Sequence, residues 1–180
     1  MSVALWRIAV AARSIAATDL SGRGAEHTGG CWNSVGRPVV YASTRISLAC
    51  LETVVHLNAG GLPLNRVLVR IDVPDEVWVA RQSLWGTSRA DGWHAVPAAS
   101  ASVDAGNAWL DGLASSLLLV PSAIVPEEFN VLLNPRQVDA AGVMATVVRP
   151  WSYDGRLLAS RLRGCENIPS SPPASVARLV

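Results

Sequence analysis

The chain has 180 residues, of which 50% are hydrophobic and 16% are charged, and its formal net charge is +1. This length and composition predict one globular domain with a sizeable core and exclude an intrinsically disordered chain. The near-zero net charge argues against a surface for nucleic acid or an anionic membrane, although it leaves room for a small basic pocket that binds one nucleotide.

The N-terminal segment, residues 1–14, lacks the basic start, the long apolar run and the cleavage site of a secretory signal. The longest apolar run, residues 116–125, is interrupted by Pro121 and is much shorter than the roughly 20 residues that span a bilayer. The three cysteines are scattered and form no CxxC pair, which argues against a disulfide framework and a zinc site. We therefore expect a cytoplasmic protein that binds no membrane.

The first third of the chain predicts strand and helix around a loop rich in glycine. Ser43 or Thr44 is expected to cap the helix, whose end is marked by the glycine pair at 60–61. The elements expected here are a strand or turn over 5–10, the glycine-rich loop over 19–36, a buried strand over 38–43 and a helix from the cap to about residue 58.

A strand is predicted over residues 65–73, because valine and isoleucine alternate there with Leu68, Arg70 and Asp72. Residues 77–103 are irregular and rich in tryptophan. We interpret this stretch as an insertion, either a long loop or a set of short helices. Its tryptophans either form a binding surface or pack a small core or an interface with another chain.

The last part of the chain predicts one helix followed by several strands. Asp104 is expected to cap a helix that runs to about residue 115. Three strands are expected over 116–120, 130–133 and 142–150. This order of elements favours an α+β fold in a single domain over 1–158, followed by a flexible tail rich in proline and serine over 159–180.

The glycine-rich stretch over 22–33 is the first candidate binding element. Glycine allows positive φ and close approach of the backbone to a ligand, and exposed amides there can hold a phosphate or a carboxamide. The stretch fits neither a Rossmann nor a P-loop pattern, so spacing alone favours a flexible surface loop over a binding element at this point.

Glu52 lies within an apolar helical segment, where a carboxylate is costly unless it has a partner or a chemical task. His56 follows four residues later on the same helical face. Two interpretations are open: Glu52 is a buried functional carboxylate, or it occupies an exposed edge and pairs weakly with His56 or Arg45.

Two further residues stand beside apolar strands. Tyr41 either stacks on a ligand ring or fills the core. Ser122 either hydrogen-bonds a ligand or stabilises a turn. His27 and His94 lack ligand spacing, so no metal site is expected, and no GxSxG motif is present.

Several short motifs follow one another in order: LWR at 5–7, LSGRGA at 20–25, GGCWNSVG at 29–36, PVVYAS at 38–43, SLACLE at 47–52 with His56, LVPSA at 119–123 and NVLLNP at 130–135. Together they resemble the RES-domain family over about residues 5–156. That resemblance implies a fold similar to ADP-ribosyltransferases, with a mixed or antiparallel β core and flanking helices. It also implies a toxin of a toxin–antitoxin pair that consumes NAD by hydrolysis, phosphorolysis or ADP-ribosylation of a protein.

The same resemblance implies roles for single residues. Glu52 would be the catalytic carboxylate, Tyr41 would line the nicotinamide pocket and Ser122 would hydrogen-bond within it. The NAD-binding residues would be Arg7, Gly22, Gly24, Gly29, Gly30, Trp32, Asn33 and His56. The expected partner is a helix-turn-helix (Xre-like) antitoxin that blocks the NAD pocket.

Cys31 departs from the family pattern, in which an arginine follows the two glycines. Arginine offers a permanent positive fork for phosphate, whereas cysteine offers neither charge nor reach. We expect weakened NAD binding or turnover, from an engineered or selected inactive variant or from natural drift. A thiol nucleophile is a third interpretation, and only His27 is near enough in sequence to activate it.

Two hypotheses follow for the whole chain. In the first it is an NAD-consuming toxin, attenuated at Cys31. In the second it is a catalytically inactive module that binds NAD or its antitoxin and acts in regulation.

Overall fold

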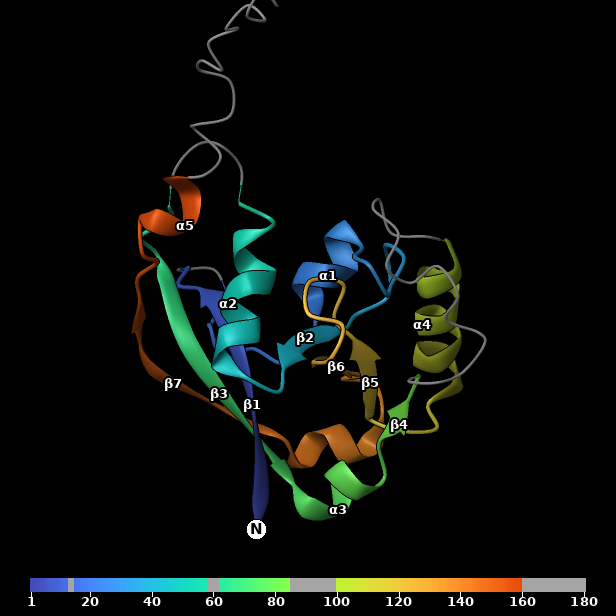
Figure 1. The fold of residues 1–180 in the computed structure, drawn as a ribbon. Helices are drawn as coiled ribbons and strands as arrows, with labels where there is room; N and C mark the ends of the chain where they lie inside the picture. The colour runs from blue at the N-terminus through green and yellow to red at the C-terminus, as the bar shows by residue number, and fades with distance from the viewer. Residues whose placement is uncertain (13–14, 58–61, 85–99, 160–180) are drawn as a thin grey trace, which may run out of the picture.

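The computed structural model describes residues 1–12, 15–57, 62–84 and 100–159, and its centre is one seven-stranded sheet (Figure 1). The strands lie in the order β4-β5-β6-β2-β1-β3-β7. All neighbours are antiparallel except β4 and β5, so the sheet is mixed. Their bounds are β1 Ser2–Val10, β2 Val40–Ser43, β3 Arg66–Pro74, β4 Gln82–Ser83, β5 Leu117–Pro121, β6 Phe129–Leu133 and β7 Met144–Trp151.

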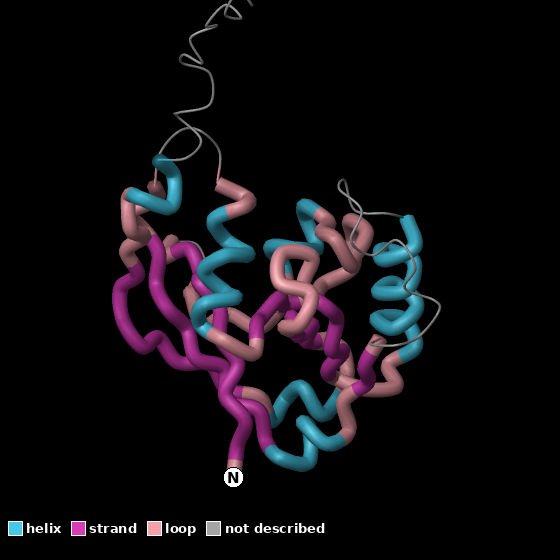
Figure 2. Tube along the Cα trace, viewed as in Figure 1, coloured by secondary structure: helices cyan, strands magenta, loops and turns pink. Residues whose placement is uncertain are grey.

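Short helices cover both sides of the sheet, which confirms the predicted α+β class and single domain (Figure 2). The two longest helices, α2 and α4, pack on the same side of the sheet. The helices are α1 Arg23–Thr28, α2 Ile46–Val54, α3 Asp75–Val79, α4 Ser100–Gly112, the 3-10 segment η2 Val138–Gly142 and α5 Arg156–Ala159. Among the described residues, no helix is long and apolar enough to cross a membrane.

Register shows which strand residues share a face, because directly paired residues point to the same side and neighbours along a strand point to opposite sides. Trp6 pairs with Ser43, Ser43 pairs with Asn130, and Tyr41 pairs with Leu132. These residues define what we name the α2 face, which carries both α2 and α4, with α1 between the two helices (Figure 1). The other side, named the opposite face, carries the largest apolar cluster, which includes Leu5, Val69 and Ile71.

Two helix starts differ from the sequence prediction. Neither Ser43 nor Thr44 caps α2, because Ser43 Oγ donates to Asn130 Oδ1 and Thr44 Oγ1 donates to the Phe129 carbonyl. Arg45 stands at the cap position without a side-chain cap, and α2 ends at Val54, not near residue 58. Helix α4 begins at Ser100, so Asp104 lies inside it and caps nothing.

The other observed elements differ from the predicted ones in smaller ways. The N-terminal strand or turn is a full strand, β1, and the glycine-rich loop contains a short helix, α1. The irregular region after residue 77 holds the end of α3 and the short strand β4, while residues 85–99 lie outside the described residues. The proposed tail lies outside them too, apart from residue 159 at the end of α5.

Candidate active site

Glu52 is held by two hydrogen bonds that reach the same carboxylate oxygen. Ser122 Oγ donates to Glu52 Oε1 over 2.8 Å, and Asn130 Nδ2 donates to the same atom over 2.5 Å. Across the described parts of the chain, no hydrogen-bond partner is found for Oε2. The partly buried carboxylate therefore has one oxygen fixed by the protein and one oxygen available to a ligand.

The alternative of a weak pairing between Glu52 and His56 or Arg45 is wrong. Arg45 Nε lies 3.7 Å from Glu128 Oε1. His56 lies two residues beyond the end of α2 and is exposed. Because His56 has left the helical register, the four-residue spacing no longer places it beside Glu52.

Of the two roles that the sequence left open for Ser122, the structure shows the stabilisation of a turn, and it adds a hydrogen bond to Glu52. Ser122 follows β5 and is completely buried (0% exposed). Its Oγ accepts hydrogen bonds from the backbone amides of Ile124 and Val125 at 3.1 and 3.2 Å and donates its own proton to Glu52. A hydroxyl has one proton and two lone pairs, so Ser122 has no capacity left for a ligand and serves to stabilise the turn and orient the carboxylate.

Asn130 and Ser43 complete what we name the Glu52 cluster: Glu52, Ser122, Asn130 and Ser43. Ser43 Oγ donates to Asn130 Oδ1 over 2.7 Å, and the two residues are directly paired across β2 and β6. Sequence reasoning missed both. The available signal was a polar residue in each of two otherwise apolar strands.

Tyr41 lines the same face through its ring, while its hydroxyl is used by the protein. The hydroxyl donates to Asn33 Oδ1 over 2.8 Å and accepts from the Trp32 amide over 3.1 Å. Burial raises the pKa of Tyr41 far above its usual range. Gly30 is required here, because a Cβ at that position would lie 2.6 Å from the Tyr41 hydroxyl oxygen. Only the ring of Tyr41 remains free to contact a ligand.

Asn33 and Trp32 hold the loop that follows α1 and do not face a ligand. Asn33 is 1% exposed, and its Nδ2 donates to the carbonyls of Ala25, Ser34 and Arg37. Trp32 is buried in an apolar cluster that includes residues of α4. The prediction that these two side chains bind NAD is corrected accordingly: their contacts are with the protein.

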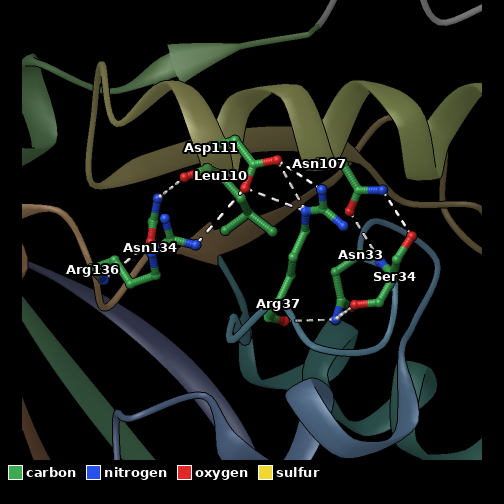
Figure 3. A network of polar contacts seen from close by, with 8 residues as sticks. All are labelled: Asn33, Ser34, Arg37, Asn107, Leu110, Asp111, Asn134 and Arg136. Atoms are coloured by element: carbon green, nitrogen blue, oxygen red, sulfur yellow. Dashed lines mark hydrogen bonds and ion pairs between the residues drawn. The ribbon is translucent and has the colours of Figure 1, made fainter.

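Residues 29–37, named the 29–37 loop, are fastened to α4 by a polar network (Figure 3). The Ser34 amide donates to Asn107 Oδ1 over 3.0 Å, and Asn107 Nδ2 donates back to Ser34 Oγ over 2.8 Å. Arg37 makes a two-pronged ion pair with Asp111, whose other neighbour is Arg136 at 3.7 Å. Helix α4 therefore fixes the position of the loop that carries residue 31.

Cys31 is exposed on this loop and lies near enough to Glu52 to respond to its charge. Partial burial of the thiol and the negative charge of Glu52 both raise the pKa of Cys31. A raised pKa keeps the thiol protonated at neutral pH, and the thiolate is the nucleophilic form. The raised pKa thus counts against the interpretation of Cys31 as a nucleophile.

Arg7 is separated from the Glu52 cluster by the sheet. It pairs with Val69 and follows Trp6, so its side chain emerges on the opposite face, where its guanidinium donates to the Ala17 carbonyl over 3.0 Å. Burial lowers the pKa of Arg7, an effect that the charge of Asp19 partly offsets. The prediction that Arg7 shares an NAD site with Glu52 is wrong in this structure.

The structure requires glycine at two of the other three predicted positions and not at the third. Gly22 and Gly29 adopt positive φ of 73° and 68°, which favours glycine. A Cβ at Gly22 would also lie 2.5 Å from the Val39 amide nitrogen. Gly24 lies in α1 with open space around it, so neither conformation nor packing requires glycine there.

The cavity that the structure shows most clearly lies away from the Glu52 cluster. This cavity of about 420 Å³ is lined by Leu20, Leu133, Arg136 and neighbouring residues, and none of the Glu52 cluster lines it. Within the described ranges, no group of three or more histidine, cysteine, aspartate or glutamate side chains is placed to hold a metal ion.

Comparison with known proteins places most of the chain in one family. The RES domain family matches residues 4–155. A protein of Sphingobium sp. (strain YBL2) named "Prs ADP-ribosylating toxin" is 52% identical over 158 residues, which are 88% of this chain and 98% of that protein. Proteins named "Toxin Res" are 39% identical in Pseudomonas putida (85% and 98% covered) and 35% identical in Yersinia enterocolitica (83% and 94% covered).

Proposed function

The chain belongs to the RES-domain family, and from this membership we propose that it is a toxin that cleaves NAD between nicotinamide and ribose and transfers ADP-ribose to an acceptor. The relatives are named as toxins, and the name of the Sphingobium relative, which is 52% identical, also includes ADP-ribosylation. The acceptor we favour is a protein side chain, as the name of the Sphingobium relative implies for that protein. Phosphate or water as acceptor, which would make the reaction phosphorolysis or hydrolysis, is the alternative.

The observation that carries this proposal is the geometry of Glu52. In the reaction, the bond between the nicotinamide nitrogen and ribose C1′ breaks, and the nitrogen keeps the electron pair. Positive charge then develops on the ribose ring, and a carboxylate fixed beside it stabilises that charge. Glu52 has the required free oxygen because Ser122 and Asn130 bind only Oε1.

The acceptor completes the reaction by forming a bond to C1′ and losing its proton. Glu52 is the described carboxylate placed to take up that proton or to orient the acceptor. The ring of Tyr41, on the same face of the sheet, forms the wall against which the planar nicotinamide packs.

We propose that Cys31 weakens the reaction. The Glu52 cluster, Tyr41 and Cys31 include no cationic side chain, so the described site offers the NAD phosphates no charged partner of its own. Residue 31 is exposed, so an arginine side chain has space at this position. The negative charge of Glu52, which acts on residue 31, would also attract a guanidinium there.

The second candidate function is a catalytically inactive module that binds NAD or an antitoxin and acts in regulation. The lack of a cationic side chain among the Glu52 cluster, Tyr41 and Cys31 favours it, because these described residues can contact nicotinamide through the Tyr41 ring but offer the phosphates no positive charge. In either case the proposed partner is a helix-turn-helix (Xre-like) antitoxin, and the proposed location is the cytoplasm. NAD is the substrate or ligand in both, and no metal takes part in the proposal.

The test is release of nicotinamide from NAD by the chain and by the Cys31→Arg variant, each with and without phosphate and with cell extract as a source of protein acceptors. Release by the Cys31→Arg variant alone supports an attenuated toxin, and phosphate dependence identifies phosphorolysis. No release by either form, together with an NAD-dependent rise in Tm, favours the binding module, since a ligand at about 100 times its Kd adds about 2.7 kcal/mol of stability.

A further inference from the structure

We propose that Asn130 is a positioning residue for Glu52 and that Ser43 holds the Asn130 amide in place through a hydrogen bond to its Oδ1. The inference rests on the proposed function, because it assigns both residues a part in the cleavage of NAD. Neither residue has to touch the substrate. Their effect passes through Glu52, whose oxygen Oε2 they leave in a defined place.

The hydrogen-bond chain has one consistent arrangement of protons. The ionised carboxylate of Glu52 only accepts, so the Asn130 side chain must present its NH2 group to Oε1. Its carbonyl oxygen then points to Ser43, whose hydroxyl must donate. The carboxylate, which cannot donate, therefore sets the orientation of the amide, and Ser43 supports that orientation by donating to Asn130 Oδ1.

Two donors on one oxygen fix the carboxylate more firmly than one. Ser122, which follows β5, and Asn130 of β6 both donate to Oε1. Each is itself held in place, Ser122 by two backbone amides and Asn130 by Ser43. Rotation of the carboxylate would break both bonds. Catalytic groups lose activity when they are displaced by about 1 Å, so a fixed Oε2 is worth a large factor in rate.

The choice of residues in these strands supports a functional reason. Asparagine is disfavoured in strands, and a buried hydroxyl is costly unless it is hydrogen-bonded. Nevertheless Ser43 is buried in β2, and Asn130 occupies β6 between apolar neighbours.

The experiment uses the full chain carrying Cys31→Arg and measures kcat and KM for nicotinamide release from about pH 5 to about pH 8. Asn130→Ala is expected to lower kcat about 10- to 100-fold with little change in KM. Ser43→Ala is expected to lower kcat in the same direction by a smaller factor.

Asn130→Asp separates positioning from simple packing. At neutral pH the new carboxylate repels Glu52, so kcat falls further than in Asn130→Ala. As the pH falls, one proton shared by the two carboxylates restores a donor to Oε1, and the kcat of Asn130→Asp rises relative to that of Asn130→Ala. A residue that only fills space does not produce this divergence.

Asn134→Ala is the matched control, because Asn134 is also a buried asparagine next to β6 and its amide donates to the Leu110 carbonyl. Its pH profile should stay parallel to the parent's, whatever stability it loses. Cleavage by the parent with unchanged kcat in Asn130→Ala would overturn this inference alone. If Asn130→Ala does not fold, parallel pH profiles of kcat for Asn130→Asp and the parent would overturn the inference instead. If the parent itself does not cleave NAD, the proposed function is overturned as well.

Discussion

Gly106 of α4 lies directly against the backbone of Trp32, so that a Cβ at position 106 would come within 1.9 Å of the Trp32 carbonyl oxygen. Because backbone is the obstacle, no side-chain rotation relieves the contact. The helix and the 29–37 loop can therefore approach this closely only with glycine at position 106.

Gly106→Ala is accordingly expected to destabilise the protein by about 1–3 kcal/mol, the usual cost of overpacking. It should also displace the 29–37 loop and lower nicotinamide release by the Cys31→Arg chain. Urea unfolding measures the first effect, and initial rates measure the second. Gly112→Ala, in the same helix with open space around it, is the control, and an equal loss of stability there would contradict the explanation.

Glu52→Gln should abolish NAD cleavage in the Cys31→Arg chain and leave folding intact. The amide oxygen still accepts hydrogen bonds from Ser122 and Asn130, whereas the negative charge is lost, and one well-placed electrostatic contact is worth about 100- to 1000-fold in rate. Glu128→Gln, which removes a surface carboxylate near Arg45, is the control for charge. If Glu52→Gln unfolds the chain, Glu52 is structural and its assignment as the catalytic carboxylate fails.

Alkylation of Cys31 tests its closeness to Glu52 without any enzymatic assay. The negative charge of Glu52 helps to raise the pKa of Cys31. Glu52→Gln removes that charge, so the pKa of the thiol should fall and iodoacetamide should react faster at neutral pH. Mass spectrometry of the peptide that contains Cys31 gives its rate apart from Cys50, whose rate should not change. Equal rates at Cys31 in both proteins would show that the two groups do not interact.

The ion pair between Arg37 and Asp111 predicts a dependence of stability on pH. The guanidinium of Arg37 holds the pKa of the Asp111 carboxyl below its usual range. A lowered pKa in the folded state gives stabilisation that is present above the unfolded-state pKa of about 3.9 and is lost as the pH falls through the lowered value. The Tm difference between the parent and Asp111→Asn should therefore be small at neutral pH, because both groups are partly exposed, and should shrink further in acid. A difference that grows in acid would contradict this sign.

Local patterns in the sequence identified most of the sheet. The alternation around Ile71 and the apolar runs at β5 and β6 gave strands within two residues of their observed bounds. Glu52 and Ser122 stood out because each is a polar residue in an apolar setting. The sequence could not show that they bind each other, since 70 residues separate them.

The failures have a common physical cause, which is competition from distant partners. Ser43 and Thr44 have side chains that commonly cap helices, but here both side chains donate hydrogen bonds to residues of β6. Arg7 matches the family motif, yet its place on the opposite face depends on the pairing of β1 with its neighbours. Asn130 became visible as a site residue only once β6 was seen beside β2.

The position of β6 between β2 and β5 has a consequence for how the protein is made. Glu52 reaches its two donors only after residues 122–133 have joined the sheet, and Asn130 follows Glu52 by 78 residues. A nascent chain that has emerged from the ribosome only as far as β3 therefore carries the carboxylate without its partners. Any harmful activity of this site begins late in synthesis, after nearly three quarters of the chain has been translated, which leaves time for an inhibitor already present in the cell to meet the protein as it becomes competent.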